Sequence, residues 1–215
     1  MAMLVGGASA AVRDTISLNA GWQFHLGELA GIEAVKNAKS ERVNLPHDFL
    51  IGQPWVEPDA SERPDNSDAG SNVRSRLSPR GFKEMNVGWY RYVLTPKAEW
   101  KGRRVVLDFQ GIMLVGDVWL NGKHIGKTDY GYLGFDTDIS SILKYDGDNE
   151  IIVKANTQQP NNSRWYTGGG LYRDVNLIVT DKKLYFPRHP LFIRTENNKK
   201  VKIQAEIACF NKVDN

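Results

Sequence analysis

The fold is decided by the stretch Val118-Trp119-Leu120-Asn121-Gly122-Lys123-His124-Ile125-Gly126. The Asn-Gly pair in its middle is the strongest short signal for a β-hairpin, because a type I′ turn needs a positive φ at both central residues. Runs that contain Val, Ile, Leu and Trp lie on either side of the pair. The stretch therefore predicts two antiparallel strands joined by a two-residue turn.

Apolar residues recur at every second position on both sides of this hairpin. The pattern is clearest in residues 105–109, 151–155 and 175–179, and no segment shows a sustained helical stripe. A period of two is typical of strands with one buried face, so residues 105–109 are predicted to form a half-buried strand. Short strands at this spacing, with turn residues between them, predict an all-β protein with a jelly-roll β-sandwich.

The composition excludes several classes of function. The 215 residues are enough for one large β-domain, or for one domain and part of another. The net charge is only +3 and the Lys and Arg residues are scattered, which argues against a nucleic-acid partner. No run approaches the roughly 18 apolar residues of a membrane span. The single cysteine, Cys209, excludes an intramolecular disulfide and a cysteine-based metal site.

The first residues are small and apolar and end in an Ala-x-Ala pattern, Ala8-Ser9-Ala10. This pattern is typical of the end of a signal peptide, and it predicts a secreted or periplasmic bacterial protein. A tag is the alternative origin of the same residues. We assign residues 1–13 to a disordered signal-peptide remnant or tag, and residues 14–184 to the jelly-roll domain.

Two segments interrupt the strand pattern. Residues 56–80 contain almost no apolar side chains, and their richness in Pro, Ser, Asp and Asn predicts a long mobile loop. Residues 186–190, Phe-Pro-Arg-His-Pro, are typical of a linker, since proline cannot continue a central strand. The alternating run 191–209 predicts an amphipathic hairpin, which alone is marginal in water. We therefore expect residues 185–215 to be a linker and the start of a second β-domain that is truncated.

Several motifs, taken in order, resemble glycoside hydrolase family 2, the family of β-galactosidases, β-glucuronidases and β-mannosidases. Each motif alone is weakly specific, but their order over about 160 residues is highly specific, and the resemblance covers nearly the whole chain. The motifs span Leu18–Phe24, Val43–Phe49, Gly88–Arg91, Val118–Gly126, Tyr130–Tyr132, Phe135–Ile139, Asn162–Gly168 and Gly170–Val175.

The resemblance implies a sugar-binding jelly roll, then an immunoglobulin-like sandwich, to whose first strands residues 185–215 would belong, and then a TIM barrel with two catalytic glutamates. The Ser-Arg-Trp-Tyr loop is most similar to bacterial β-galactosidases. The implied role is that of an accessory domain in an exo-acting enzyme, whose substrate is the end of a β-galactoside oligosaccharide or polysaccharide. A β-glucuronidase or β-mannosidase is the alternative within the family. A free-standing carbohydrate-binding module is the alternative from another class, and the sequence leaves open whether the protein is a homo-oligomer.

The catalytic groups are expected outside these 215 residues. A retaining glycosidase needs two carboxyl groups about 5–5.5 Å apart, and no motif of this sequence nominates such a pair. The resemblance places the catalytic glutamates in the barrel, so we expect no hydrolysis by this chain alone. The resemblance also implies magnesium or sodium near the sugar in related β-galactosidases, but no residue cluster here predicts a metal site.

The candidate substrate-binding residues are Asn162, Arg164, Trp165, Tyr166 and Asp48. The first four lie in the glycine-rich loop 161–170, whose aromatic side chains can stack on sugar C–H faces and whose polar groups can bridge hydroxyls. Alternatively, the aromatic residues pack beneath the next domain and Arg164 is paired across that interface. Asp48 follows a strand, and it either accepts hydrogen bonds from sugar hydroxyls or closes the strand as an Asx turn.

Four further conspicuous residues are assigned structural roles. His47 is predicted to be a structural histidine rather than a ligand. Trp22, Trp89 and Trp119 lie within strand patterns, so they are predicted to pack in the core or between sheets rather than to serve as sugar platforms.

Overall fold

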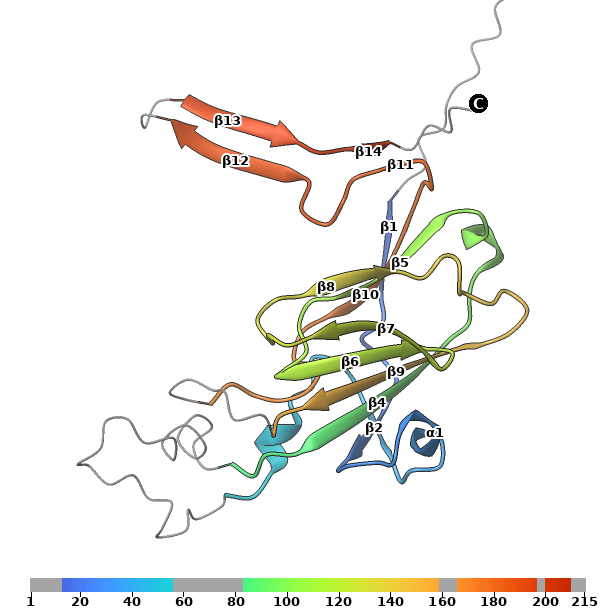
Figure 1. Ribbon diagram of the computed structural model, residues 1–215, viewed down its shortest axis with the longest axis vertical. Coiled ribbons are helices and arrows are strands. Elements are labelled where there is room, and N and C mark those ends of the chain that lie inside the picture. Colours follow the sequence, from blue (N-terminus) through green and yellow to red (C-terminus); the bar gives the residue numbers. More distant parts are fainter. Residues whose placement is uncertain (1–12, 56–82, 159–165, 197–199, 210–215) are drawn as a thin grey trace, which may run out of the picture.

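A computed structural model describes residues 13–55, 83–158, 166–196 and 200–209 (Figure 1). Residues 1–12, 56–82, 159–165, 197–199 and 210–215 lie outside these ranges. The predictions for the leader, for the loop 56–80 and for the site residues Asn162, Arg164 and Trp165 therefore concern residues that are not described.

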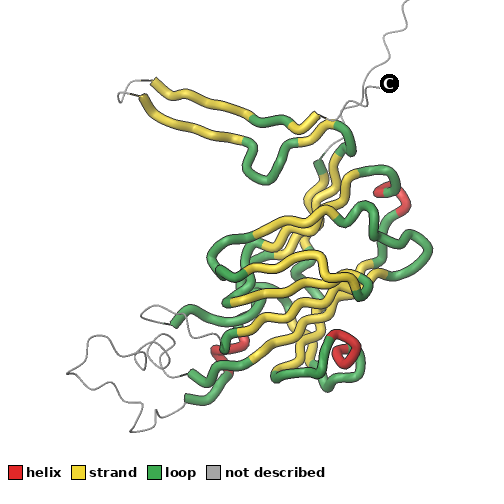
Figure 2. Tube along the Cα trace, in the orientation of Figure 1, coloured by secondary structure: helices red, strands yellow, loops and turns green. Residues whose placement is uncertain are grey.

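Two antiparallel sheets form most of the described chain. The larger sheet has the strand order β3-β2-β4-β9-β6-β7, and the smaller has the order β1-β10-β5-β8. They lie face to face in Figures 1 and 2, which confirms the predicted β-sandwich. The strands are β1 Asp14–Ser17, β2 Trp22–Leu26, β3 Glu41–Val43, β4 Val87–Leu94, β5 Arg104–Phe109, β6 Val115–Leu120, β7 Lys123–Thr128, β8 Phe135–Asp138, β9 Asn149–Asn156 and β10 Val175–Thr180.

Helices are short and peripheral. In the described ranges they are α1 Ile32–Val35 and the 3₁₀ turns η1 Phe49–Gly52 and η4 Ala98–Trp100. Among the described residues, no helix has the length and apolar character needed to cross a membrane.

The Asn-Gly hairpin forms as predicted. Strands β6 and β7 pair antiparallel, and Asn121 and Gly122 have φ values of 51° and 83°, as a type I′ turn requires. The side chain of Asn121 donates to Asn149 Oδ1 at 2.8 Å and accepts from the backbone N–H of Glu150 at 3.0 Å. The turn is therefore tied to the start of β9, which lies beside β6 in the sheet.

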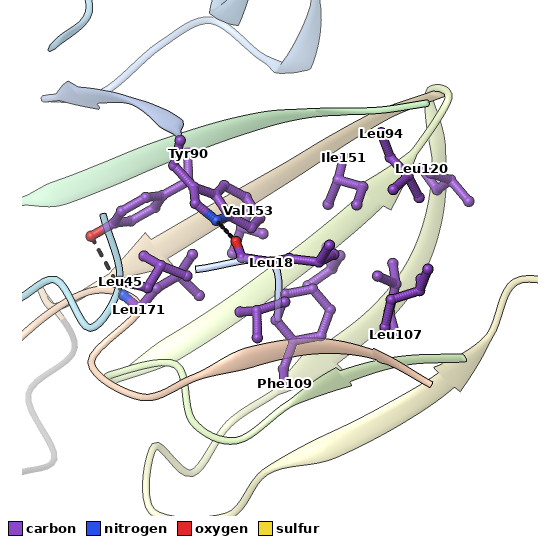
Figure 3. Close-up of a cluster of buried hydrophobic side chains, with 14 of the residues drawn as sticks. Leu18, Leu45, Tyr90, Leu94, Leu107, Phe109, Leu120, Ile151, Val153 and Leu171 are labelled. Carbon is purple, nitrogen blue, oxygen red and sulfur yellow. Dashed lines mark hydrogen bonds between the residues drawn. The ribbon is translucent and has the colours of Figure 1, made fainter. Parts of the chain in front are cut away.

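The hydrophobic core lies between the two sheets (Figure 3). Its side chains come from alternate positions of the strands, so each strand contributes one face, as the period of two predicts. Full burial of one large apolar side chain stabilises the fold by about 1.5–3 kcal/mol. Residues of both sheets take part, among them Trp22, Tyr90, Val118, Ile151, Val153, Val105, Leu107, Phe109, Val175 and Leu177.

Strand β5 differs from the prediction, because it is buried on both faces rather than half-buried. Val106 and Asp108 alternate with the core residues, yet they are only 1% and 8% exposed. The linker covers them: Phe186 to His189 line the same groove as Val106 and Asp108, and Arg188 Nη1 lies 2.9 Å from Asp108 Oδ1. A contact between residues 80 positions apart therefore contributes to the burial of the outer face of this strand.

The three tryptophans that were predicted to pack internally divide between two clusters. Trp22 lies in the core between the sheets, as predicted. Trp89 and Trp119 instead stack on each other on the outer face of the six-stranded sheet, with ring centroids 6.0 Å apart. Val35 of α1 packs in the same cluster, so the short helix acts as a cover for this second apolar patch.

A separate two-stranded ribbon follows the linker and extends away from the sandwich in Figure 1. It consists of β12 Leu191–Glu196 and β13 Lys200–Ala205, paired antiparallel as predicted, and its apolar side chains are exposed. At its base, β11 Leu184–Tyr185 pairs with β14 Ala208–Cys209. Strand β11 thus spans the predicted boundary between residues 184 and 185, and the domain division stays a prediction.

Candidate functional site

Two segments that are far apart in sequence pair at one end of the sandwich. Residues 47–49 follow β3, and residues 166–171 precede β10. The backbone N–H of His47 donates to Leu171 O at 2.8 Å, and that of Phe49 donates to Gly169 O at 3.1 Å. On its other side, Gly170 exchanges two backbone hydrogen bonds of 2.7 and 2.9 Å with Met113. The described end of the candidate loop is therefore fixed by backbone pairing on both sides.

The carboxylate of Asp48 joins these segments. Its Oδ1 accepts from the backbone N–H of Leu50 at 3.0 Å and from that of Gly169 at 2.8 Å. Its Oδ2 accepts from the hydroxyl of Tyr166 at 2.6 Å. Asp48 is therefore an Asx-type cap of η1, one of its two predicted roles, and it also holds the loop. Its role as an acceptor for sugar hydroxyls stays a prediction.

Two glycines allow the loop to approach Asp48 closely. Gly168 and Gly170 have φ values of 78° and 102°, a region that residues with a side chain rarely adopt. A Cβ atom on Gly170 would also meet His47 O at 3.0 Å. Both positions therefore require glycine for the observed path of the chain.

The structure brings together two of the five predicted site residues, Asp48 and Tyr166, which are 118 positions apart. Tyr166 is partly exposed and Asp48 is partly buried, so a phenol edge meets solvent beside the carboxylate at this end of the sandwich. Such an edge can offer hydrogen bonds and apolar surface to a sugar. Asn162, Arg164 and Trp165 belong to the same loop but lie outside the described residues.

His47, which is partly buried, and Tyr90, which is fully buried, form a polar pair beside the site. His47 Nδ1 lies 2.9 Å from the Tyr90 hydroxyl. The backbone N–H of Leu171 also donates to this hydroxyl, at 3.4 Å (Figure 3). Burial lowers the pKa of His47, although Glu41 and Asp48 act in the opposite direction, and burial raises the pKa of Tyr90. A neutral ring with its proton on Nε2 lets Nδ1 accept the hydroxyl proton of Tyr90.

This pair gives His47 the hydrogen-bond partner that a structural histidine needs, and the prediction that it is not a ligand stays a prediction. Tyr90 was not predicted as its partner. The available signal was that a tyrosine inside a strand pattern needs a hydrogen-bond partner when it is buried.

Replacing Asp48 with alanine is expected to lower the free energy of unfolding by about 1–2 kcal/mol, because a helix cap is lost and the N–H of Gly169 loses its acceptor. Urea unfolding measures this loss in the free energy of unfolding. The matched control is Asp148→Ala, since Asp148 accepts a hydrogen bond from the exposed Thr95 hydroxyl in a turn; its effect should stay within about 0.5 kcal/mol. Equal losses in both variants would contradict the anchoring role.

The free energy of unfolding is expected to decrease at acidic pH because of the protonation of His47. Because its folded pKa lies below the ordinary 6.5, the unfolded chain binds a proton that the folded chain does not. The free energy of unfolding should therefore decrease as the pH falls from above 6.5 through the folded pKa. His47→Asn should flatten this dependence in urea unfolding between about pH 8 and pH 5. An unchanged pH profile would show that His47 does not contribute.

The described residues at this end of the sandwich were considered as possible metal ligands. In the part of the chain that the structure describes, no group of three or more His, Cys, Asp or Glu side chains could hold a metal ion. The polar groups of the site are instead occupied with each other and with the backbone.

Comparison with known proteins connects this sandwich to one family. The family model for the glycosyl hydrolase 2 galactose-binding domain-like domain matches residues 81–177. A β-galactosidase of Bacteroides ovatus is 32% identical over 172 residues, which is 78% of this chain and 18% of the relative. A β-glucuronidase of Bacteroides fragilis is 29% identical over 82% of this chain and 22% of the relative.

A solved structure agrees with these relatives. The crystal structure of a β-glycosidase from Bacteroides vulgatus matches with a TM-score of 0.73 and 30% identity, over 93% of this chain and 25% of that chain. The chain thus spans about a fifth to a quarter of the length of these proteins. Through its β-sandwich, the chain belongs to the galactose-binding-like amino-terminal domains of glycoside hydrolase family 2.

Proposed function

We propose that this chain is the amino-terminal domain of a longer, retaining, exo-acting β-glycosidase of the β-galactosidase type. In this proposal Asp48 and the loop residues Asn162, Arg164, Trp165 and Tyr166 form one wall of the sugar pocket. The catalytic acid and nucleophile belong to another part of the longer protein. The relatives support this arrangement, because the chain spans only 18% of the β-galactosidase that it resembles.

The observation that carries the proposal is the contact between Asp48 and Tyr166. Two motifs that were singled out for sugar binding meet at one end of the sandwich through a 2.6 Å hydrogen bond. Backbone hydrogen bonds and the carboxylate of Asp48 fix the loop from Tyr166 to Leu171. A fixed loop on a rigid sandwich can position side chains precisely, which is what a binding wall requires.

The wall would orient the terminal sugar and would take no part in breaking the glycosidic bond. Aromatic side chains would cover the apolar C–H face of the terminal sugar, and polar side chains would bind its hydroxyls. A wall that closes one end of the pocket admits only a chain end, which makes the enzyme exo-acting. Held in one orientation, the glycosidic bond lies between the two catalytic carboxyl groups that retaining hydrolysis needs.

A β-glucuronidase is the second candidate, because a relative with that name is 29% identical over most of the chain. A β-glucuronidase would need a cationic group that binds the uronate carboxylate. A β-mannosidase would need different side chains to bind the sugar hydroxyls. A free-standing carbohydrate-binding module is the candidate from another class. We also propose export to the periplasm or the exterior, which the Ala8-Ser9-Ala10 pattern supports.

Hydrolysis of nitrophenyl β-D-galactoside, β-D-glucuronide and β-D-mannoside tests the proposal. The longer protein should show its highest kcat/KM with the galactoside, and the 215-residue chain should hydrolyse none of them. A higher kcat/KM for the glucuronide or mannoside would establish the alternative within the family. Turnover by the short chain would overturn the assignment of the catalytic groups, and an inactive longer protein would favour the binding module.

A further inference from the structure

The chain that leaves β10 is held on the outer face of the four-stranded sheet at two points. At the first point, the guanidinium of Arg104 lies over the ring of Tyr185, with Cζ 4.1 Å from the ring centroid. At the second point, three residues further along the chain, Arg188 Nη1 lies 2.9 Å from Asp108 Oδ1. One attachment would leave the segment free to swing, whereas two attachments fix both its position and its direction.

The first attachment depends on an arginine that the sheet already orients. The side chain of Arg104 is only 16% exposed, and its Nε lies 3.1 Å from Asp138 Oδ2 in the neighbouring strand β8. Asp138 is itself held, because its Oδ1 accepts from the backbone N–H of Ser140 at 3.0 Å. A guanidinium that is paired at its edge keeps its flat face for an aromatic ring, and Tyr185 occupies that face.

The second attachment is an ion pair on the floor of the groove. Asp108 is only 8% exposed, and the carboxylate of Asp136 lies 3.9 Å from the same guanidinium nitrogen of Arg188. A Cβ atom on Gly134 would collide with Arg188 Nη2 and with Phe109 O, so the glycine leaves room for the guanidinium. Desolvation offsets much of the attraction in such a pair, but a displaced linker would separate a buried carboxylate from its partner. The pair therefore selects one position of the linker.

The ribbon is joined to the same segment at its base. Strand β11, which contains Tyr185, pairs with β14, and the backbone N–H of Glu206 donates to Pro190 O at 2.7 Å. Pro187 and Pro190 restrict the backbone between the second attachment and β12, because the proline ring fixes φ. The ribbon therefore cannot turn relative to the sandwich unless the segment is released from the sheet.

We propose that Arg104 and Arg188 clamp this segment to the sandwich and thereby fix the direction in which the ribbon leaves the domain. Both arginines are positioning residues. The outer face of the four-stranded sheet serves as a docking surface for the chain's own continuation. This role explains why β5 buries Asp108 on the face that points away from the core.

Distances between two spin labels test the clamp in the 215-residue chain, with Cys209 replaced by serine. One label is attached to β7 through Lys123→Cys and the other to the ribbon through Thr195→Cys, both at exposed positions. Pulsed electron paramagnetic resonance should give one narrow distance distribution. Arg188→Ala should broaden this distribution at least about twofold, because a released linker samples many directions.

The matched control is Arg173→Ala. Arg173 lines the same groove, but it donates to Tyr132 O at 3.4 Å and its Cζ lies 5.1 Å from the ring centroid of Tyr172, both in the sandwich. Its removal should leave the distribution narrow, whereas Arg104→Ala should broaden it. Thermal unfolding verifies that each labelled variant remains folded.

A second variant tests the ion pair without truncating a side chain. Asp108→Asn keeps the shape of the side chain and should also broaden the distribution. The double variant should be no broader than Arg188→Ala alone, because both changes remove the same pair. A broad distribution before any clamp residue is changed, no broadening by Arg188→Ala, equal broadening by Arg173→Ala, or additive broadening in the double variant would each overturn the proposal. Because neither sugar binding nor hydrolysis is measured, these outcomes are independent of the proposed function.

Discussion

Replacing Trp22 with alanine is expected to lower the free energy of unfolding by about 3–5 kcal/mol, the range typical of a large aromatic removed from a core. Trp22 is fully buried, and its ring lies against Tyr90 and Tyr92, with centroids 6.4 and 5.0 Å away. Its Nε1 donates to Leu18 O at 2.6 Å, so the substitution leaves a cavity and a carbonyl without its donor. Urea unfolding of the 215-residue chain measures the loss.

The matched control for this prediction is Trp55→Ala. Trp55 is 69% exposed and contacts Lys83, whose Nζ lies 4.4 Å from the ring centroid. Removal of an exposed ring should change the free energy of unfolding by about 1 kcal/mol or less. If the two variants lose the same stability, the core does not lie where the structure places it.

Replacing Arg164 with alanine in the proposed longer enzyme is expected to lower kcat/KM for a β-galactoside about 10- to 100-fold. A hydrogen bond from a charged group contributes about 1.5–3 kcal/mol, and its loss reduces the stabilisation of the transition state by that amount. The jelly roll should stay folded, because the described pairing between residues 47–49 and 169–171 does not involve Arg164. Steady-state kinetics and thermal unfolding separate the two effects.

Arg103→Ala is the matched control for the Arg164 variant. Arg103 precedes β5, whereas the candidate site lies at the opposite end of that strand, and its Nη1 donates to Asp14 Oδ2 at 2.8 Å. Its removal should leave kcat/KM nearly unchanged. If kcat/KM is unaffected by Arg164→Ala, Arg164 does not belong to the site, and the pocket wall would have to be formed by other residues.

Local patterns were sufficient to predict the sandwich. The turn at Asn121 and Gly122 depends on the φ values of two adjacent residues, and the core face of β5 follows from simple alternation. The other face of β5 could not be predicted. Its burial depends on Arg188, which is 80 residues away, and nothing in the sequence around Asp108 indicates that partner.

In the candidate site, too, local motifs could be predicted and contacts between distant residues could not. Asp48 and Tyr166 were found because they lie in recognisable motifs, but the hydrogen bond between them joins residues 118 positions apart. Whether Asp48 caps a turn or reaches a ligand depends on which donors the fold brings near it. The structure supplies these donors from Leu50, Gly169 and Tyr166, and the same residue thereby connects the sandwich to the loop.

The most direct test of the pocket wall is a crystal structure of the longer protein with a galactose-derived inhibitor bound. We predict that at least one polar side chain from residues 162–166 lies within about 3.2 Å of a sugar hydroxyl, and that Asp48 still holds Tyr166 beside it. A sugar bound with the whole loop out of contact would contradict the account.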